Sequence, residues 1–245
     1  MIIAIIQSRM GSSRLPGKVM KKIDNKILME YQLDRVLASK RIDKVVIATS
    51  ILKQDDVIEN FCNDYGIECF RGSENDVLSR YYECAKYYKA DIIVRLTADC
   101  PLVDPLIIDK VIDKFKEDNV DYCGNTVPLE TNTFPDGTDT EVFSMESLSK
   151  AYKEIKDFHF REHVTFQFWQ NKEYSKTQLF NEKNYSDYRI TVDYPEDFEV
   201  VSFIFRELKK RESFGHLDEI IEILNSNPDV KKKNDKYYFG QGWKK

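Results

Sequence analysis

The sequence predicts an α/β protein of three layers, in which helices cover both faces of a mostly parallel sheet. Along residues 1–120, short apolar and β-branched runs alternate with amphipathic helical patterns, as in successive βαβ units. The run DIIVRL at 91–96 is apolar enough for a strand that is buried on both faces. After residue 120 the alternation breaks, which indicates an inserted or appended segment.

The first half is expected to contain four strands, each followed by a helix. The strands are predicted at Met1–Gln7, Lys44–Thr49, Ile67–Phe70 and Asp91–Leu96. The helices are predicted at Ile27–Ala38, Asp55–Tyr65, Asp76–Tyr88 and Pro105–Lys116. Asp104 is expected to cap the last helix, because an Asp followed by proline at the first helical position satisfies free N–H groups.

The second half begins with a turn-rich stretch, residues 121–145, that holds one alternating strand. The elements expected after it are a helix at Met145–Ile155, an aromatic segment at Phe158–Trp169, strands near Thr177–Phe180 and Tyr188–Val192, and two C-terminal helices. No repeat or linker interrupts the 245 residues. We therefore expect a single domain with two parts, residues 1–120 and 121–245.

Composition and charge exclude several classes of protein. The chain is 42% hydrophobic, which allows a large core, and its net charge of −5 argues against a nucleic-acid surface. No apolar run approaches the ~20 residues of a membrane span, so we expect a cytoplasmic protein that binds no membrane. The five cysteines have no CxxC spacing and are expected to be reduced thiols.

A cationic loop follows the first strand, at residues 8–18 (SRMGSSRLPGK). In an open parallel sheet, ligands collect at the carboxyl ends of the strands. Glycine backbone and the hydroxyls of Ser12 and Ser13 can approach an anion, and Arg9, Arg14 and Lys18 supply charge for a polyphosphate. The residue after the lysine is valine, so this is not a Walker loop. The alternative is a solvated basic loop.

Six motifs occur in order along the chain, namely AIIQSRMGSSRLPGK (4–18), RGSENDVLSRY (71–81), VRLTADCPLVDP (94–105), FPDGTDTEVF (134–143), REHVT (161–165) and RITVDYPED (189–197). Together they resemble the cytidylyltransferases that activate acidic sugars, such as the CMP-Kdo and CMP-sialate synthetases. The similarity is greatest to the spore-coat polysaccharide branch of that superfamily. One departure is Ala98, where the family usually has glycine.

The resemblance implies a Rossmann-like sheet of the nucleotide-diphospho-sugar transferase type. It also implies an Mg²⁺-dependent transfer of CMP from CTP to an acidic sugar, with release of pyrophosphate, for a surface polysaccharide. Relatives are commonly homodimers in which the middle segment crosses to the partner. The aromatic stretch Phe158–Trp169 suits such a contact, and packing against the sheet explains it equally well.

The family's metal-binding aspartates match Asp99 and Asp193. Each follows an apolar strand pattern, where the phosphates are expected to lie, and carboxylate oxygens are suitable ligands for Mg²⁺. The alternatives are structural, a turn cap before Pro101 and an N-cap of the helix that begins at Pro195.

The resemblance also implies the nucleotide site. Arg14, Lys18 and Asp99 are its expected catalytic residues. The residues expected to contact the nucleotide are Gln7, Ser8, Arg9, Met10, Gly11, Ser12, Ser13, Arg14, Lys18, Thr49, Ser50, Arg71, Asp76, Val77, Leu78 and Ala98. Arg71 is expected to donate to the cytosine carbonyl, and an ordinary salt bridge is its alternative role.

The acceptor is expected to bind in the part of the chain where the βα alternation is lost. Its expected residues are Asp136, Gly137, Asp139, Glu141, Arg161 and His163. The three carboxylates, in and beside a turn that contains the glycine, can bind hydroxyls, and the arginine and histidine can meet an anion. The alternative is a charged turn with no ligand. Phosphorylated and phosphonate acceptors also remain open.

Three other functions are compatible with parts of the sequence. HFREH at 159–163 fits the HxxEH pattern of inverted zinc peptidases, but it leaves the cationic loop and both aspartates unexplained. A glycosyltransferase that uses a nucleotide sugar would also place carboxylates on a metal. A nucleotide-binding regulatory module would need the loop but neither aspartate.

Overall fold

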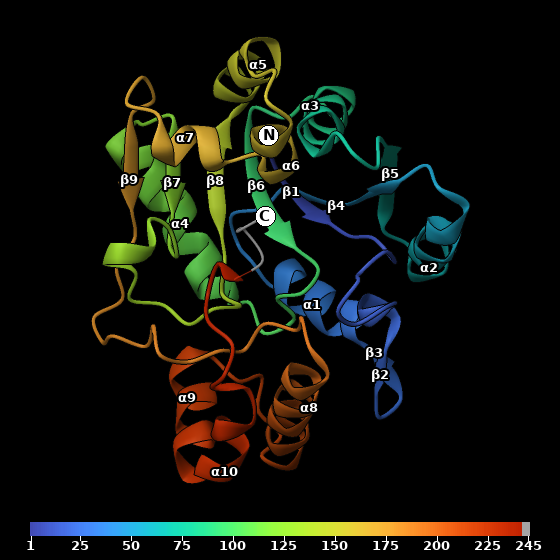
Figure 1. Cartoon of the computed structure of the whole chain (residues 1–245), viewed down its shortest axis with the longest axis vertical. Coiled ribbons are helices and arrows are strands. Elements are labelled where there is room, and N and C mark those ends of the chain that lie inside the picture. Colours follow the sequence, from blue (N-terminus) through green and yellow to red (C-terminus); the bar gives the residue numbers. More distant parts are fainter. Residues whose placement is uncertain (242–245) are drawn as a thin grey trace.

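The computed structural model describes residues 1–241 and confirms the predicted α/β architecture. A seven-stranded sheet runs in the order β5-β4-β1-β6-β8-β7-β9 (Figure 1). The strands are β1 (Ile2–Gln7), β4 (Lys44–Ser50), β5 (Glu68–Gly72), β6 (Ile92–Thr97), β7 (Tyr122–Gly124), β8 (Glu141–Ser144) and β9 (Lys176–Gln178). β5, β4, β1 and β6 are parallel, β8 is antiparallel to both of its neighbours, and β9 is parallel to β7.

Helices cover both faces of the sheet. One face packs α1 (Leu28–Leu37), α2 (Asp56–Tyr65) and α4 (Pro105–Asp118), and the other packs α3 (Val77–Tyr87), α5 (Met145–Glu154) and α7 (Phe166–Gln170). α6 (Phe158–His163) contacts α3. A third apolar cluster joins α8 (Pro195–Lys210) to α9 (Leu217–Ser226), and α10 (Pro228–Lys231) packs beside them. No helix within residues 1–241 has both the length and the apolar character needed to span a membrane.

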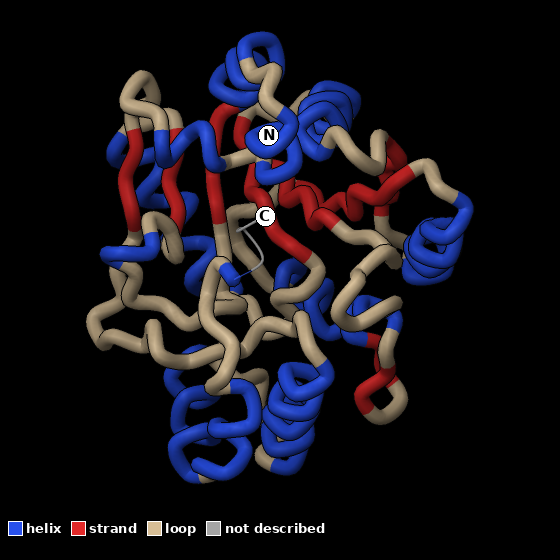
Figure 2. The backbone as a smooth tube through the Cα atoms, in the orientation of Figure 1, coloured by secondary structure: helices blue, strands red, loops and turns tan. Residues whose placement is uncertain are grey.

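Short elements complete the described chain. A small hairpin, β2 (Lys22–Ile23) and β3 (Lys26–Ile27), lies before α1. The 3₁₀ turns are η1 (Lys18–Met20), η2 (Lys53–Asp55), η3 (Leu129–Thr131) and η4 (Lys232–Asn234). Figure 2 shows long loops between the sheet and the group formed by α8, α9 and α10. This region lies at the carboxyl ends of β1 and β6.

β1 shows why the N-terminal sequence forms a central strand. Ile3 and Ile5 are fully buried against the α3 and α5 side, and Ala4 and Ile6 are fully buried against the α1 and α4 side. Because successive side chains of a strand point to opposite faces, a continuous apolar run suits only a strand that is covered on both faces.

Two strand predictions are wrong in the second half. No strand forms at 188–192, where the structure has only an isolated bridge between Arg189 and Asp136. Its backbone instead bonds to loops, as Val192 N donates to Asp99 O at 2.8 Å and Ile190 N to Asp136 O at 2.7 Å. Residues 121–145 contain two strands, β7 and β8, rather than one.

The predicted cap at Asp104 is confirmed and has a second role. Its carboxylate accepts the Leu106 N–H at 2.9 Å, within the first turn of α4. The same carboxylate accepts the Leu217 N–H at 2.9 Å and therefore ties α9 to α4. The expectation of unpaired cysteines is also confirmed, since all five are free thiols.

Candidate active site

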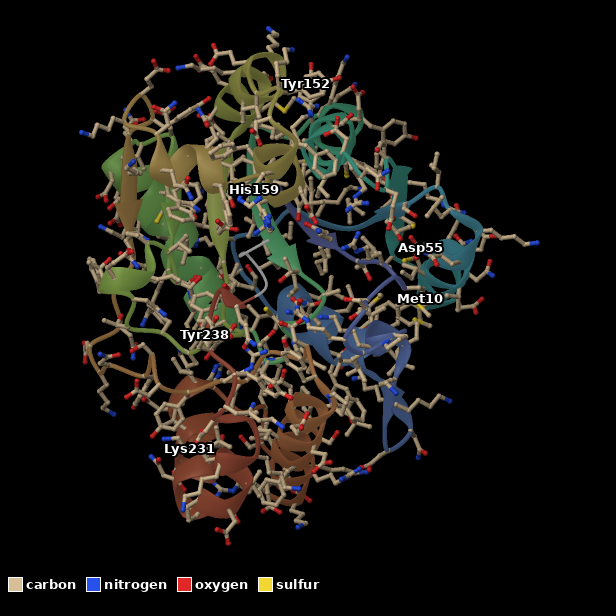
Figure 3. The ribbon with its side chains drawn as sticks, viewed as in Figure 1. Met10, Asp55, Tyr152, His159, Lys231 and Tyr238 are labelled. Atoms are coloured by element: carbon tan, nitrogen blue, oxygen red, sulfur yellow. The ribbon has the colours of Figure 1, made fainter. Side chains whose placement is uncertain are left out.

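The loop after β1, residues 8–18, is folded against the ends of neighbouring strands. Ser8 N donates to Ala48 O of β4 at 3.0 Å, and Gly17 N donates back to Met10 O at 3.1 Å. Gly17 has φ +66°, a left-handed conformation that glycine adopts without strain. Met10 N donates to the buried carboxylate of Asp55 at 2.7 Å, and the two residues lie side by side in Figure 3. The loop is therefore held in one shape.

Lys18 brings the two predicted metal-binding aspartates together. Its Nζ lies 3.0 Å from Asp99 Oδ2 and 2.9 Å from Asp193 Oδ1, and it donates to Val192 O at 2.7 Å. Arg14 Nη2 lies 2.8 Å from the same Asp193 oxygen. Residues from three distant parts of the sequence thus meet at the carboxyl ends of β1 and β6.

The charges of this cluster stabilise one another. Burial by itself lowers the pKa of Lys18, but Asp99 and Asp193 outweigh it and raise that pKa above its ordinary value. Burial by itself raises the pKa of Asp99, but the charge of Lys18 together with hydrogen bonds from Lys18, Thr97 and the backbone outweighs it and lowers that pKa to about 2. Asp99 is therefore ionised at neutral pH, and together with Asp193, which contacts the same ammonium, it can hold a cation.

Asp193 is not the N-cap of α8. That position belongs to Tyr194, and Asp197 Oδ2 accepts the N–H groups of both Asp193 and Tyr194 at 2.9 Å. The carboxylate of Asp193 instead faces Lys18 and Arg14. The capping role considered for it is therefore filled by another residue.

The positions of Asp99 and Asp193 show whether this site can bind a divalent cation. Asp99 and Asp193 already converge on one ammonium, and their side chains remain 28% and 18% exposed, so ligands from solvent can reach them. Within residues 1–241, no three or more Asp, Glu, His or Cys side chains form a metal-binding group. The two carboxylates fit Mg²⁺ if phosphate and water oxygens complete its shell.

The predicted acceptor residues Asp136, Gly137 and Asp139 lie next to this cluster. Arg189 forms an ion pair with Asp136, and Asp139 accepts from Thr126 Oγ1 at 2.9 Å and from Gly137 N at 3.0 Å. Gly137 has φ +107°, and a Cβ there would lie 2.3 Å from the Thr191 backbone nitrogen. This glycine lets the acidic turn pack directly against residues 190–191.

Burial affects the two acidic side chains of that turn. It is the main reason that the pKa of Asp139 is raised to about 6. It also raises the pKa of Asp136 well above its ordinary value, although Arg189 opposes this shift. Besides these internal partners, carboxyl oxygens have further lone pairs that can accept from hydroxyl groups.

Arg71 has partners that differ from the predicted cytosine carbonyl. Its Nη1 lies 2.7 Å from both Asp56 Oδ1 and Glu59 Oε2. Its Nε donates to Ser50 O and its Nη2 to Leu52 O, both at 2.9 Å. The structure thus shows the salt bridge that was the alternative, and Arg71 fixes the connection between β4 and α2.

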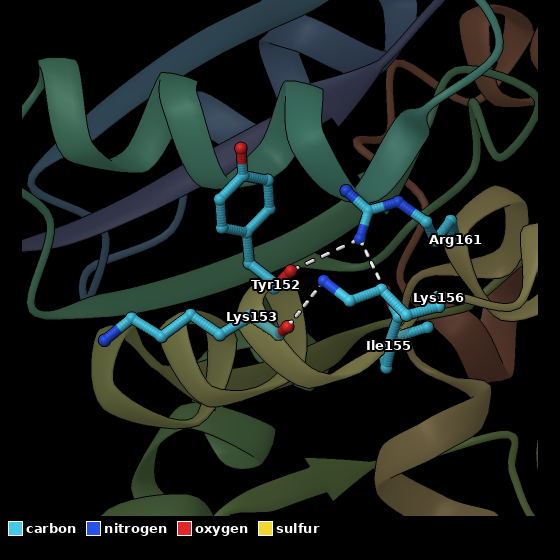
Figure 4. A pocket seen from close by; sticks show the side chains of 5 residues that line it. All are labelled: Tyr152, Lys153, Ile155, Lys156 and Arg161. Atoms are coloured by element: carbon cyan, nitrogen blue, oxygen red, sulfur yellow. Dashed lines mark hydrogen bonds between the residues drawn. The ribbon is translucent and has the colours of Figure 1, made fainter.

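Arg161 is likewise engaged within the protein. Its Nε and Nη2 donate to Asp76 Oδ2 at 2.9 and 2.7 Å, and its Nη1 donates to the carbonyls of Ile155 and Tyr152. It borders a surface hollow of about 510 Å³, whose residues Figure 4 labels. Because Asp76 also caps α3, Arg161 fastens α6 to the start of that helix.

His163 and the HxxEH pattern do not form a zinc site in the structure. The rings of His159 and His163 lie 4.7 Å apart, and His163 stacks on Phe166 at 4.3 Å. A zinc site needs a further ligand, and no group of three ligands occurs in the described chain.

Other predicted nucleotide-binding residues lie in two kinds of place, the hydrophobic core and the strand ends beside the loop. Val77 and Leu78 are buried in the core with α3, so their side chains face away from solvent. Ala98 N donates to Gln7 O at 3.0 Å, which places both at the joined ends of β1 and β6. Ser50 Oγ donates to Asp55, the carboxylate that also holds Met10.

Two important residues were missed by the sequence reasoning. Arg189 bonds Asp136, Asp193 and Asp197, and it lies within the quoted motif RITVDYPED. Asp55 positions the loop after β1 and was predicted only as the start of a helix. Arg189 could have been found, because a basic residue in a strand-like apolar run is unusual. Nothing in the neighbouring sequence marked the role of Asp55.

Glu141 lies in a buried ion pair inside the sheet. Arg95 of β6 faces it across the β6–β8 ladder, and Tyr122 Oη donates to it at 2.6 Å. Its side chain is only 7% exposed, so the pair has little contact with solvent. These partners differ from the predicted sugar hydroxyl.

We expect Glu141→Gln to lower the free energy of unfolding by about 3 kcal/mol, because it leaves the buried Arg95 without a counter-charge. Urea denaturation measures this change, and the exposed Glu146→Gln serves as the matched control. A stability equal to that of the wild-type protein would contradict the structural role of the pair.

Comparison with known proteins connects this geometry to a family. Residues 3–239 match the family model described as cytidylyltransferase. The chain is 37% identical over 238 residues to the uncharacterized protein MJ1063 of Methanocaldococcus jannaschii, covering 95% of this chain and 94% of that protein. It is 32% identical over 246 residues to the spore coat polysaccharide biosynthesis protein SpsF of Bacillus subtilis, covering 94% and 96%.

A solved structure agrees with these relatives. The structure of a cytidylyltransferase from Leptospira borgpetersenii superposes with a TM-score of 0.87 at 34% identity, covering 94% of this chain and 96% of that one. The comparisons confirm the resemblance found in the six motifs. The chain therefore belongs to the cytidylyltransferase family, and it is an enzyme of the nucleotidyltransferase class.

Proposed function

We propose that this protein transfers CMP from CTP to an acidic sugar or a related acceptor and releases pyrophosphate. The observation that carries the proposal is the convergence of Lys18 and Arg14 on Asp99 and Asp193 at the carboxyl ends of β1 and β6. A cationic loop next to two converging carboxylates suits a triphosphate with a divalent cation.

The reaction needs little covalent participation by the protein. An acceptor oxygen attacks the α-phosphorus, and a hydroxyl acceptor gives up its proton to water. The bond from that phosphorus to the bridging oxygen breaks, and pyrophosphate leaves with the electron pair of that bond. Lys18 and Arg14 neutralise phosphate charge, and the backbone of residues 8–18 orients the triphosphate. Mg²⁺, held by Asp99 and Asp193, supplies further neutralisation of phosphate charge when bound.

The acceptor site is assigned to the turn with Asp136, Gly137 and Asp139. These carboxyls lie next to Asp99 and Asp193 and contribute to the same electrostatic environment. Hydroxyl groups of a sugar match acceptors of this kind. A product for surface polysaccharide, a homodimer and a cytoplasmic location accord with the family resemblance and belong to the same proposal.

We expect CTP to be preferred over UTP, ATP and GTP. Uracil presents a carbonyl where cytosine presents an amino group, so buried polar groups would be mismatched, and a purine is larger than the pyrimidine it would replace. The test measures pyrophosphate release from the four triphosphates with acidic sugars, phosphorylated acceptors and phosphonates.

No polymeric acceptor is added. A glycosyltransferase would release no pyrophosphate in this assay, because its donor is a nucleotide sugar and not a nucleoside triphosphate. Release that depends on CTP and on one acceptor class supports the proposal and identifies the acceptor. A clear preference for UTP or a purine would contradict the proposed use of CTP.

A further inference from the structure

Arg80 is a buried arginine with only part of its guanidinium in use. It lies on α3, is 1% exposed, and donates through Nη1 to Ser73 O at 2.9 Å. Its Nε and Nη2 atoms are buried and have no hydrogen-bond partner within residues 1–241. A buried cation with unused donors costs free energy unless acceptors reach it. This points to a ligand.

The position of Arg80 places that ligand beside the loop after β1. Its stem passes Gly72 at the end of β5, where an added Cβ would lie 2.9 Å from Arg80 Cγ. The charged side chains that act on its guanidinium are Glu74, Arg9 and Asp55. Arg9 belongs to the loop after β1, and Asp55 holds that loop in place by accepting the N–H of Met10. Arg80 therefore lies at the nucleotide edge of the sheet.

The unused atoms indicate the chemistry of the ligand. Nε–H and Nη2–H form one edge of the guanidinium, with two parallel donors. In this protein the same edge of Arg41 contacts both oxygens of Asp113 at 2.8 and 3.0 Å, and that of Arg189 contacts both oxygens of Asp197 at 2.9 Å. The open edge of Arg80 thus suits a group with two adjacent acceptor atoms.

We propose that the open edge of Arg80 binds O2 and N3 of the cytosine of CTP and makes Arg80 a specificity-determining residue, which rests on the proposed function. Cytosine carries two adjacent acceptors at these atoms, whereas uracil carries a hydrogen on N3 that would oppose an N–H of Arg80. Arginine reads the adjacent O6 and N7 acceptors of guanine in the same way.

A second unpartnered atom fits the same base. Glu74 Oε2 is buried without a hydrogen-bond partner in the described chain, while its other oxygen lies 3.2 Å from Arg9 Nη1. This oxygen is the acceptor for the amino group at C4 of cytosine. Arg71 cannot take the place of Arg80, because its Nε, Nη1 and Nη2 all have partners.

A phosphate group would also satisfy two parallel donors. The cations that suit the phosphates, however, are Lys18 and Arg14, which meet Asp99 and Asp193 on the β6 side of the sheet. Arg80 lies on the β5 side, and burial lowers its pKa. We therefore assign it to the planar edge of the base, and contact with phosphate is an outcome of the test.

The test compares Arg80→Lys with Arg41→Lys as the matched control. Arg80→Lys keeps the positive charge but removes the two parallel N–H donors of the guanidinium edge. For each enzyme, kcat/KM is measured with CTP, with UTP and with 3-deazacytidine triphosphate, in which a C–H replaces N3. We expect the wild-type enzyme to discriminate against the deaza analogue by about tenfold or more, and Arg80→Lys to lose most of that discrimination. The CTP-to-UTP ratio should also fall about tenfold in Arg80→Lys and stay unchanged in Arg41→Lys.

These ratios do not depend on the fraction of folded enzyme, because all substrates are measured on one preparation. Equal losses on all three triphosphates, with both ratios unchanged, would overturn the proposal and indicate contact with phosphate. If Arg80→Lys does not fold, the same measurement on Glu74→Gln tests the proposal. An unchanged CTP-to-UTP ratio in Glu74→Gln would also overturn the proposal. A wild-type enzyme that does not prefer CTP would instead contradict the proposed function itself.

Discussion

Replacing Asp99 or Asp193 with Asn is expected to reduce turnover by about 1,000-fold and to raise the Mg²⁺ concentration needed for half-maximal rate. Each substitution keeps the shape of the side chain and removes its charge. The two carboxylates converge on one point, so they are expected to act as a unit. The double variant should therefore be little worse than the poorer single variant.

The measurement is the rate of pyrophosphate release against Mg²⁺ concentration for both single variants and the double variant. Asp229→Asn, an exposed change on α10, is the control. Thermal unfolding should change far less than activity, because both side chains are partly exposed at the edge of the sheet. Strictly multiplicative losses, or a wild-type Mg²⁺ dependence in Asp193→Asn, would restrict the proposed site to Asp99.

Lys18→Ala is expected to lower turnover by about a hundredfold or more, an amount typical of deleting one preorganised electrostatic contact. Lys18 is the one described cation that contacts both Asp99 and Asp193, so its removal leaves the two carboxylates with less neutralisation. Pyrophosphate release at saturating CTP measures the effect. The exposed Lys22→Ala controls for loss of a positive charge nearby in the sequence. Near wild-type turnover in Lys18→Ala would show that residues 8–18 do not bind the phosphates.

The same variant has a predictable effect on acid stability. Burial raises the pKa of Asp99, but Lys18, with hydrogen bonds from Thr97 and the backbone, lowers it to about 2, so the ionised carboxylate stabilises the folded state. This contribution is fully present above the unfolded pKa of about 4 and is lost as pH falls toward 2. The wild-type protein should therefore lose stability over that range, and Lys18→Ala should lose less. Urea denaturation at several pH values measures the difference.

The first half of the fold could be predicted because its signals are local. The run at 2–6 is apolar at every position, and the structure buries it on both faces as β1. The second half was harder, because β7 and β9 are each only three residues long and pair with distant segments. Residues 188–192 have the composition of a strand, yet their backbone bonds to Asp99 and Asp136 instead of a sheet neighbour. Tertiary contacts of this kind override β propensity.

The sequence by itself determined the family, the order of the elements in the first half, and the residues that meet at the loop after β1. These follow from motifs and from periodicity, which are properties of neighbouring residues. Only the tertiary structure decided which charged groups are available to a ligand. Arg71 and Arg80 stand nine residues apart in one quoted motif. The first has a partner at each of its three nitrogens, whereas two nitrogens of the second have no partner within residues 1–241. That difference depends on carboxylates and carbonyls contributed by other elements, because a buried polar group is satisfied by whatever the fold brings to it.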